Sequence, residues 1–139
     1  MEQRDGEQAE EYDMPQEEKE KMPEQYEAVS LDDFVEYSKS MFEYWTEDDF
    51  ASSFRKMLTI EQFRSEEMQK LYQQYLVAGP ASYVKALFES IGIVNAKDKA
   101  ARFYAVMHFY YSLYDGAADK EKVKVEFVSA IKSLVQDLA

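Results

Sequence analysis

The sequence contains no cysteine and has only four glycines, three prolines and one histidine among its 139 residues. Without cysteine the chain can form no disulfide bond, hold no thiolate-bound zinc and use no cysteine nucleophile. Because His108 is the only histidine and no histidine–carboxylate motif accompanies it, we expect no metal site and no cofactor. The absence of cysteine fits a reducing compartment, and we expect a cytoplasmic protein.

Long apolar runs and strand patterns are missing as well. No stretch approaches the ~20 apolar residues that a helix needs to cross a bilayer, so we expect no membrane span. The N-terminus is acidic from Glu2 onward and lacks the apolar core of a signal peptide. No alternation of β-branched residues predicts a strand. Hydrophobic residues nevertheless make up 46% of the chain, which is enough for one all-α domain with a core.

Basic residues are scarce relative to acidic ones: 16 Lys and Arg stand against 28 Asp and Glu, for a formal net charge of −12. Most of this excess lies near the N-terminus, and we assign residues 1–29 to an acidic linker, the end of a helix followed by a loop. Residues 30–139 are the helical domain. Phosphate binding needs clustered Lys and Arg, which are lacking, so we expect no nucleic-acid binding by this chain alone.

Short polar residues that precede amphipathic stretches predict where helices begin. The expected N-caps are Ser30, Thr46, Ser65, Asn95 and Asp119. Gly79 ends the third of these helices, and Pro80 suits the first turn of the next. The sequence therefore predicts an all-α bundle of about six helices.

The stretch "FYAVMHFYYSLYDG", from Phe103 to Gly116, is apolar on nearly every side. At about 100° per residue its side chains form two faces. One face consists of Tyr104, Met107, His108 and Tyr111. The opposite face consists of Val106, Phe109, Tyr110 and Leu113. A helix that is apolar all round is buried all round, which favours burying one face in the domain and the other against a second copy of the chain.

The last predicted helix carries a seam of apolar residues that is typical of packing against another helix. The seam consists of Val123, Phe127, Ile131, Leu134 and Leu138. We therefore predict a homodimer built from the last two helices. The expected contact residues are Val106, Phe109, Tyr110, Leu113, Phe127, Val128, Ile131 and Val135. The two faces of the aromatic helix could be exchanged in this assignment, because periodicity shows that there are two and not which is which.

Two long segments resemble the C-terminal regulatory domain of TetR-type transcriptional regulators, a bacterial family. They are "FRKMLTIEQFRSEEMQKLYQQYLVAGPASYVKALFESIG", from Phe54 to Gly92, and "AARFYAVMHFYYSLYDG", from Ala100 to Gly116. "MEQRDGEQAEEYDMP" is similar to the helix that links the DNA-binding head of these regulators to the regulatory body. The resemblance implies an all-helical body, a homodimer and an internal pocket for a small effector. The basic helix-turn-helix head has no match here, so the resemblance assigns binding of operator DNA to the intact regulator only.

The aromatic helix also supplies the main candidates for an effector pocket. Tyr104, Met107, His108 and Tyr111 combine polar handles with an apolar wall, as small-molecule sites do. The alternative is a core histidine whose ring nitrogens bond to a tyrosine or a carbonyl. Weaker pocket candidates on other helices are Phe54, Met57, Tyr72 and Tyr75. A stripe of methionine and aromatic residues belongs to a core more often than to a pocket.

The function indicated by the sequence is an effector-sensing and dimerisation domain of a TetR-type regulator. The alternative is a helical module that docks another protein or has a structural role and binds no small molecule. A pocket closed inside one subunit would favour the first, and a solid core with an exposed aromatic groove would favour the second. We expect no enzyme and no catalytic residue, because no nucleophile elbow, glycine-rich phosphate loop or zinc-hydrolase motif occurs. Ser112 lies one turn from His108, which is ordinary in a helix.

Overall fold

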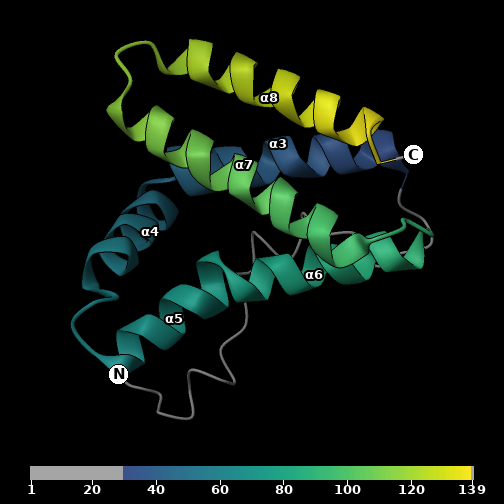
Figure 1. The fold of residues 1–139 in the computed structure, drawn as a ribbon. Coiled ribbons are helices and arrows are strands. Elements are labelled where there is room, and N and C mark those ends of the chain that lie inside the picture. The colour runs from purple at the N-terminus through teal and green to yellow at the C-terminus, as the bar shows by residue number, and fades with distance from the viewer. Residues whose placement is uncertain (1–29, 139) are drawn as a thin grey trace.

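The computed structural model describes residues 30–138, and within this range the chain forms six α-helices and no strand (Figure 1). The helices are α3 (Leu31–Glu47), α4 (Asp49–Glu61), α5 (Glu66–Leu76), α6 (Ala78–Ser90), α7 (Ala96–Gly116) and α8 (Lys120–Gln136). The predicted all-α bundle of about six helices is confirmed. None of these helices combines the length and the apolar character that crossing a membrane requires. The predicted acidic linker, residues 1–29, lies outside the described residues.

Three of the predicted N-caps form as expected. The side chains of Ser30, Ser65 and Asp119 each accept a hydrogen bond from the backbone N–H three residues further on. At Ser30 the bond is reciprocal, because the side chain of Asp33 accepts from the backbone N–H of Ser30. Such caps satisfy backbone donors that a helix start otherwise leaves unpaired, so a local sequence signal is enough to place them.

The other two predicted caps need correction. Thr46 does not begin a helix: its hydroxyl donates to the carbonyl of Phe42 within α3, and Asp48 caps α4 by accepting from the N–H of Ala51. A threonine that bonds back to the carbonyl four residues earlier is accommodated inside a helix. Asn95 does precede α7, but it lies in the left-handed region with φ of 58°, and its side chain makes no cap hydrogen bond.

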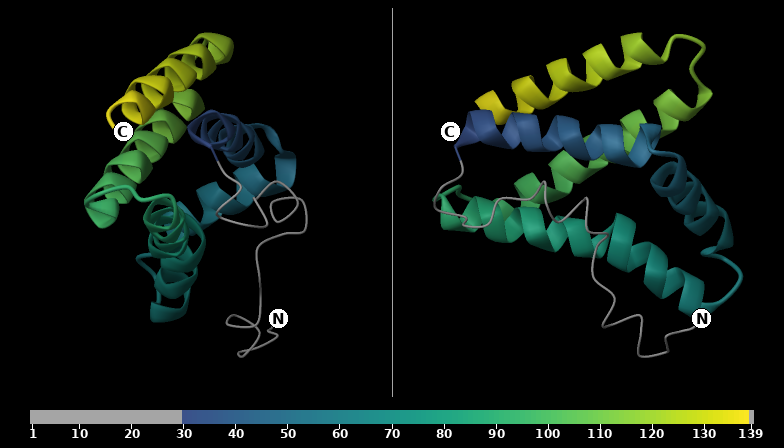
Figure 2. Two further views of the ribbon diagram at one scale, coloured as in Figure 1. Left: turned by 90° about the vertical axis from the view of Figure 1, so that its right-hand side faces the viewer. Right: turned by 180° about the vertical axis from the view of Figure 1, so that it is seen from behind.

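Helix α7 is the centre of the arrangement and packs against α3, α6 and α8 (Figure 1). Viewed along the bundle, α8 lies over α7 and α3, while α5 and α6 follow one another along the opposite side (Figure 2). Helices α3 and α8 run antiparallel and contact each other directly. Every helix therefore contributes to one core, and α7 joins its two sides.

Aromatic rings link α3, α7 and α8. The rings of Phe42 and Phe127 stack with their centroids 4.2 Å apart, and the ring of Tyr111 also stacks against Phe42, at 5.6 Å. Near the other end of α3, Phe34 packs against Phe103 at 4.9 Å. Each aromatic pair contributes about 0.5–1.5 kcal/mol beyond the burial of its area. The aromatic character of α7 is thus used largely inside the subunit.

The apolar seam of the last helix, predicted to meet another helix, packs within the same chain. Its members Val123, Phe127, Ile131 and Leu138 are buried, and Leu134 is half-buried against the core. Helices α7 and α3 supply the opposing surfaces. The seam is therefore already covered in one subunit, and a second copy would have to bind to other residues of α8.

Candidate functional site

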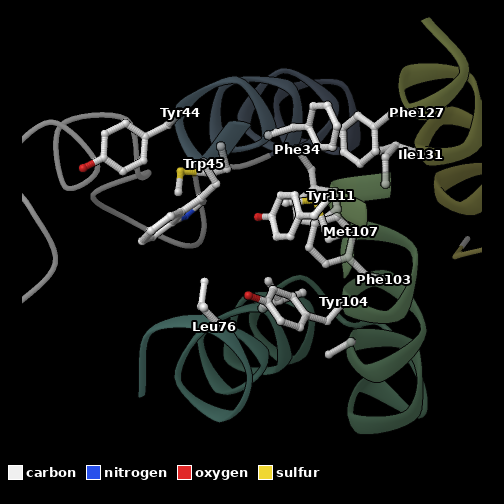
Figure 3. Close-up of a cluster of buried hydrophobic side chains, with 14 of the residues drawn as sticks. Phe34, Tyr44, Trp45, Leu76, Phe103, Tyr104, Met107, Tyr111, Phe127 and Ile131 are labelled. Carbon is white, nitrogen blue, oxygen red and sulfur yellow. The ribbon is translucent and has the colours of Figure 1, made fainter. Parts of the chain in front are cut away.

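A small, partly open cavity lies where α3, α6 and α7 meet. Its volume is about 20 Å³, and it is lined by Tyr37, Met41, Trp45, Pro80, Val84, Phe103, Tyr104, Met107 and Tyr111. Figure 3 shows the rings of Tyr104 and Tyr111 extending from α7 toward Trp45 of α3. A space of this size holds about one water molecule. The inner face of α7 thus borders the cavity, but the cavity is far smaller than a ligand site.

His108 lies beside this cavity and serves a defined structural role. Its Nε2 is 2.7 Å from the carbonyl oxygen of Leu76, the last residue of α5. In a continuous helix this carbonyl would accept from the N–H of residue 80, but Pro80 has none. Because the carbonyl can only accept, Nε2 carries the hydrogen and donates it. The geometry corresponds to the core-histidine alternative, in which the ring bonds to a backbone carbonyl.

Three tyrosines surround the imidazole of His108. The ring centroids of Tyr104, Tyr111 and Tyr72 lie 4.8, 5.7 and 6.4 Å from it, all in edge-on orientations. His108 itself is half-buried. The predicted candidate Tyr72 is thus brought next to His108, although neither residue lines the cavity.

The remaining predicted ligand residues lie elsewhere. The ring of Phe54 packs against Tyr75 at 5.4 Å, and Met57 is 38% exposed on α4. None of the three lines the cavity. The residues of α3 that do line it were missed, although Tyr37, Met41 and Trp45 recur every four residues and hence share one face of a helix.

Gly79 does not end α5 as predicted: α5 ends at Leu76, and Gly79 lies in the first turn of α6, where the chain needs a glycine. A Cβ atom added to Gly79 would lie 1.9 Å from the backbone carbonyl oxygen of Gln74, which is far inside van der Waals contact. Neighbouring Pro80 lines the cavity, and α6 begins without a side-chain cap. The sequence Gly79-Pro80 therefore allows a close approach of the two helices, and His108 supplies the donor that the proline removes.

Arg55 is a buried cation that sequence reasoning missed. Its side chain is only 6% exposed, and its Nε donates to the carbonyl of Trp45 at 2.9 Å. The two terminal nitrogens donate to the carboxylate of Asp115 at 3.0 and 2.7 Å, and the guanidinium lies 4.9 Å from the centroid of the Tyr111 ring. The signal was its position on the face of α4 that also buries Ala51. Arg55 thereby holds α4 to the ends of α3 and α7.

The predicted dimer residues divide into exposed and buried groups. Phe109 and Leu113 are 58% and 39% exposed on α7, which makes them the solvent-facing members of the set. The half-buried members are Val106, Tyr110 and Val128, and the buried ones are Phe127, Ile131 and Val135. The opposite face of α7 points inward, with Tyr104, Met107 and Tyr111 buried. The two faces of α7 thus differ sharply in exposure.

The titratable side chains in the described part of the chain form no candidate metal site. Among residues 30–138, no group of three or more carboxylate or imidazole side chains is arranged to hold a metal ion.

In comparisons with known proteins, the chain matches no family model, no curated protein and no solved structure. The resemblance to TetR-type regulators stays a prediction that depends on the quoted motifs.

Proposed function

We propose that this chain is the effector-sensing and dimerisation domain of a TetR-type transcriptional regulator, in which a second copy binds to α7 and α8. The observation that carries the proposal is the pair of contrasting faces of α7. One face is buried around the cavity, and the other exposes Phe109 and Leu113 to solvent. Large apolar side chains on one exposed stripe are typical of an interaction surface. A two-fold contact is the commonest way for such a stripe to be covered.

Effector binding in this proposal requires the core to open. Ligand pockets generally occupy about 300–1,000 Å³, whereas the cavity between α3, α6 and α7 has about 20 Å³. Helix α6 is the element that we expect to move, because its first turn, which contains Gly79 and Pro80, borders the cavity, and only Val77 joins it to α5. The effector would then contact Trp45, Tyr104 and Met107.

The small volume of the cavity, which leaves the core almost solid, favours a second candidate function, a docking module that binds another protein through α7 and holds no small molecule. Both functions use the exposed stripe of Phe109 and Leu113. They differ in whether a small apolar molecule can enter between α3 and α7.

The dimer is tested by sedimentation of the wild type and of Phe109→Glu at micromolar concentration. We expect a dimeric wild type and a monomeric variant, because the substitution places two charges in the contact. The matched control is Phe50→Glu, since Phe50 is 64% exposed on α4, away from the stripe. A monomeric wild type, or equal effects of the two substitutions, would contradict the dimer.

Ligand entry is tested with Trp45, the only tryptophan, which is 3% exposed and lines the cavity. Anilinonaphthalene sulfonate, a small apolar fluorophore, should quench Trp45 in the wild type and in the control Met57→Phe. Met107→Phe, which fills the cavity, should abolish the quenching. Failure to quench Trp45 in the wild type would favour the docking module.

A further inference from the structure

An open hollow of about 470 Å³ lies at the end of the bundle where α3 begins. Figure 1 shows the start of α3, the end of α8 and the connection between α6 and α7 together at this end. The side chains that line the hollow are mostly aliphatic, and none of them is aromatic: Leu31, Ile91, Ile93, Val94 and Leu138. The hollow has the volume of a small-molecule site, and it shares no residue with the core cavity or with the expected dimer contact.

Lys99, in the first turn of α7, is the only charged side chain that lines this hollow. It is half-buried. Within residues 30–138 it takes part in no ion pair, and its ammonium group takes part in no hydrogen bond. The hollow therefore combines an aliphatic wall with one cation that these residues leave without a counter-ion.

Lys99 differs in this respect from the other cations that are buried or half-buried in the described part of the chain. Each of the others has a carboxylate partner: Arg55 has Asp115 at 2.7 Å, Lys85 has Glu89 at 3.4 Å, and Lys124 has Glu47 at 2.7 Å. Burial takes water away from a charged group and makes an opposite charge beside it favourable. An anion bound in the hollow would supply for Lys99 what a carboxylate supplies for the other three.

Two polar features define the charge that the anion should carry. The hydroxyl oxygen of Ser30, which also lines the hollow, accepts from the N–H of Asp33 at 3.1 Å, and the hydroxyl can donate its own hydrogen to a ligand. A second hollow, of about 290 Å³, borders Lys99 on its other side, but both Arg102 and Asp137 line it, and their charges offset each other. The net cation is thus Lys99 alone, which matches a single negative charge.

We propose that the hollow is a binding site for an aliphatic monocarboxylate. The carboxylate pairs with the ammonium of Lys99 and accepts from the hydroxyl of Ser30. The hydrocarbon chain lies on the aliphatic wall, which removes its apolar surface from water. The site is independent of the effector cavity in the core and does not require the core to open.

Isothermal titration calorimetry with sodium octanoate at neutral pH tests the charge recognition. We expect saturable binding, at least ~10-fold tighter than that of octylamine, which carries the opposite charge on a chain of the same length. Lys99→Gln removes the charge and should weaken octanoate binding at least ~10-fold. The matched control is Lys97→Gln, since Lys97 lies two residues away and does not line the hollow. No saturable binding by the wild type, or equal effects of the two substitutions, would overturn the proposal.

A second pair of variants tests the aliphatic wall without disturbing the core. Val94 and Val125 are 69% and 67% exposed, and only Val94 lines the hollow. Val94→Asp places a like charge beside the carboxylate and should weaken octanoate binding, whereas Val125→Asp should leave it unchanged. Amide chemical shifts in the wild type should change at Ile93 and Lys99 when octanoate is added. Equal binding by the two variants, or shift changes confined to the core around Trp45, would contradict the site.

Discussion

Arg55→Ala should strongly destabilise the fold, because it removes a cation that joins three helices. In the wild type, the guanidinium bonds to Asp115 through two nitrogens and to the carbonyl of Trp45 through a third. The substitution leaves that carbonyl without its donor and Asp115 without its partner. Tyr111 also loses the guanidinium over its ring, at 4.9 Å from the centroid.

The expected loss in the free energy of unfolding follows from how deeply the Arg55–Asp115 ion pair is buried. Breaking a buried ion pair by removing one partner costs about 3–5 kcal/mol. Asp115 is 28% exposed and can regain water, which lowers this cost, while the unpaired Trp45 carbonyl adds about 1–3 kcal/mol. We expect a loss of about 3–4 kcal/mol in the free energy of unfolding. For a domain of this size, this corresponds to a decrease in Tm of about 12–16 °C or more.

The measurement is urea unfolding followed by far-ultraviolet circular dichroism, with Arg64→Ala as the matched control. Arg64 pairs with Glu61, but it is 75% exposed, so its removal should cost less than about 1 kcal/mol. Arg55→Lys should fall between them, because a single ammonium cannot reproduce the planar, bidentate geometry. If Arg55→Ala costs no more than Arg64→Ala, the assignment of Arg55 as a structural clamp is wrong.

Two further substitutions test the α5–α6 joint and the lysine at the α3–α8 contact. Gly79→Ala should lower the free energy of unfolding by more than about 2 kcal/mol, since its Cβ would collide with the carbonyl of Gln74. The control Gly116→Ala has open space around the added Cβ and should not destabilise the fold. Similar unfolding midpoints for the two variants would refute this prediction. Hydrogen bonding to Glu47 raises the pKa of Lys124 above its ordinary value. Since the folded-state pKa is the higher one, the stabilisation is complete below about pH 10 and is lost as pH rises further. The stability difference between the wild type and Lys124→Met should therefore be constant up to about pH 10 and shrink as pH rises to about 11.5 in urea titrations, and a difference independent of pH would contradict it.

Local features of the sequence were sufficient for the helices and for most of their starts. Caps such as Ser30 and Ser65 bond to a backbone N–H only three residues away, so the signal and the structure lie in the same short stretch. The spacing of side chains in α7 likewise predicted two faces, because helical periodicity depends only on the backbone. The error at Thr46 arose because a hydroxyl can cap a helix start or bond back within a helix, and both patterns look alike in sequence.

Tertiary structure alone decided what each apolar face contacts. The last-helix seam could meet a second copy or its own chain, and it packs on α3 and α7 because the connections bring these helices together. His108 bonds to a carbonyl 32 residues away, and Arg55 binds a carboxylate 60 residues away. Periodicity carries no information over such separations, since it fixes directions around one helix and not the neighbour that lies there. The sequence by itself therefore determined the helices and their two-sided character. The tertiary structure determined which helices each face packs against, and this packing leaves a cavity about the size of one water molecule.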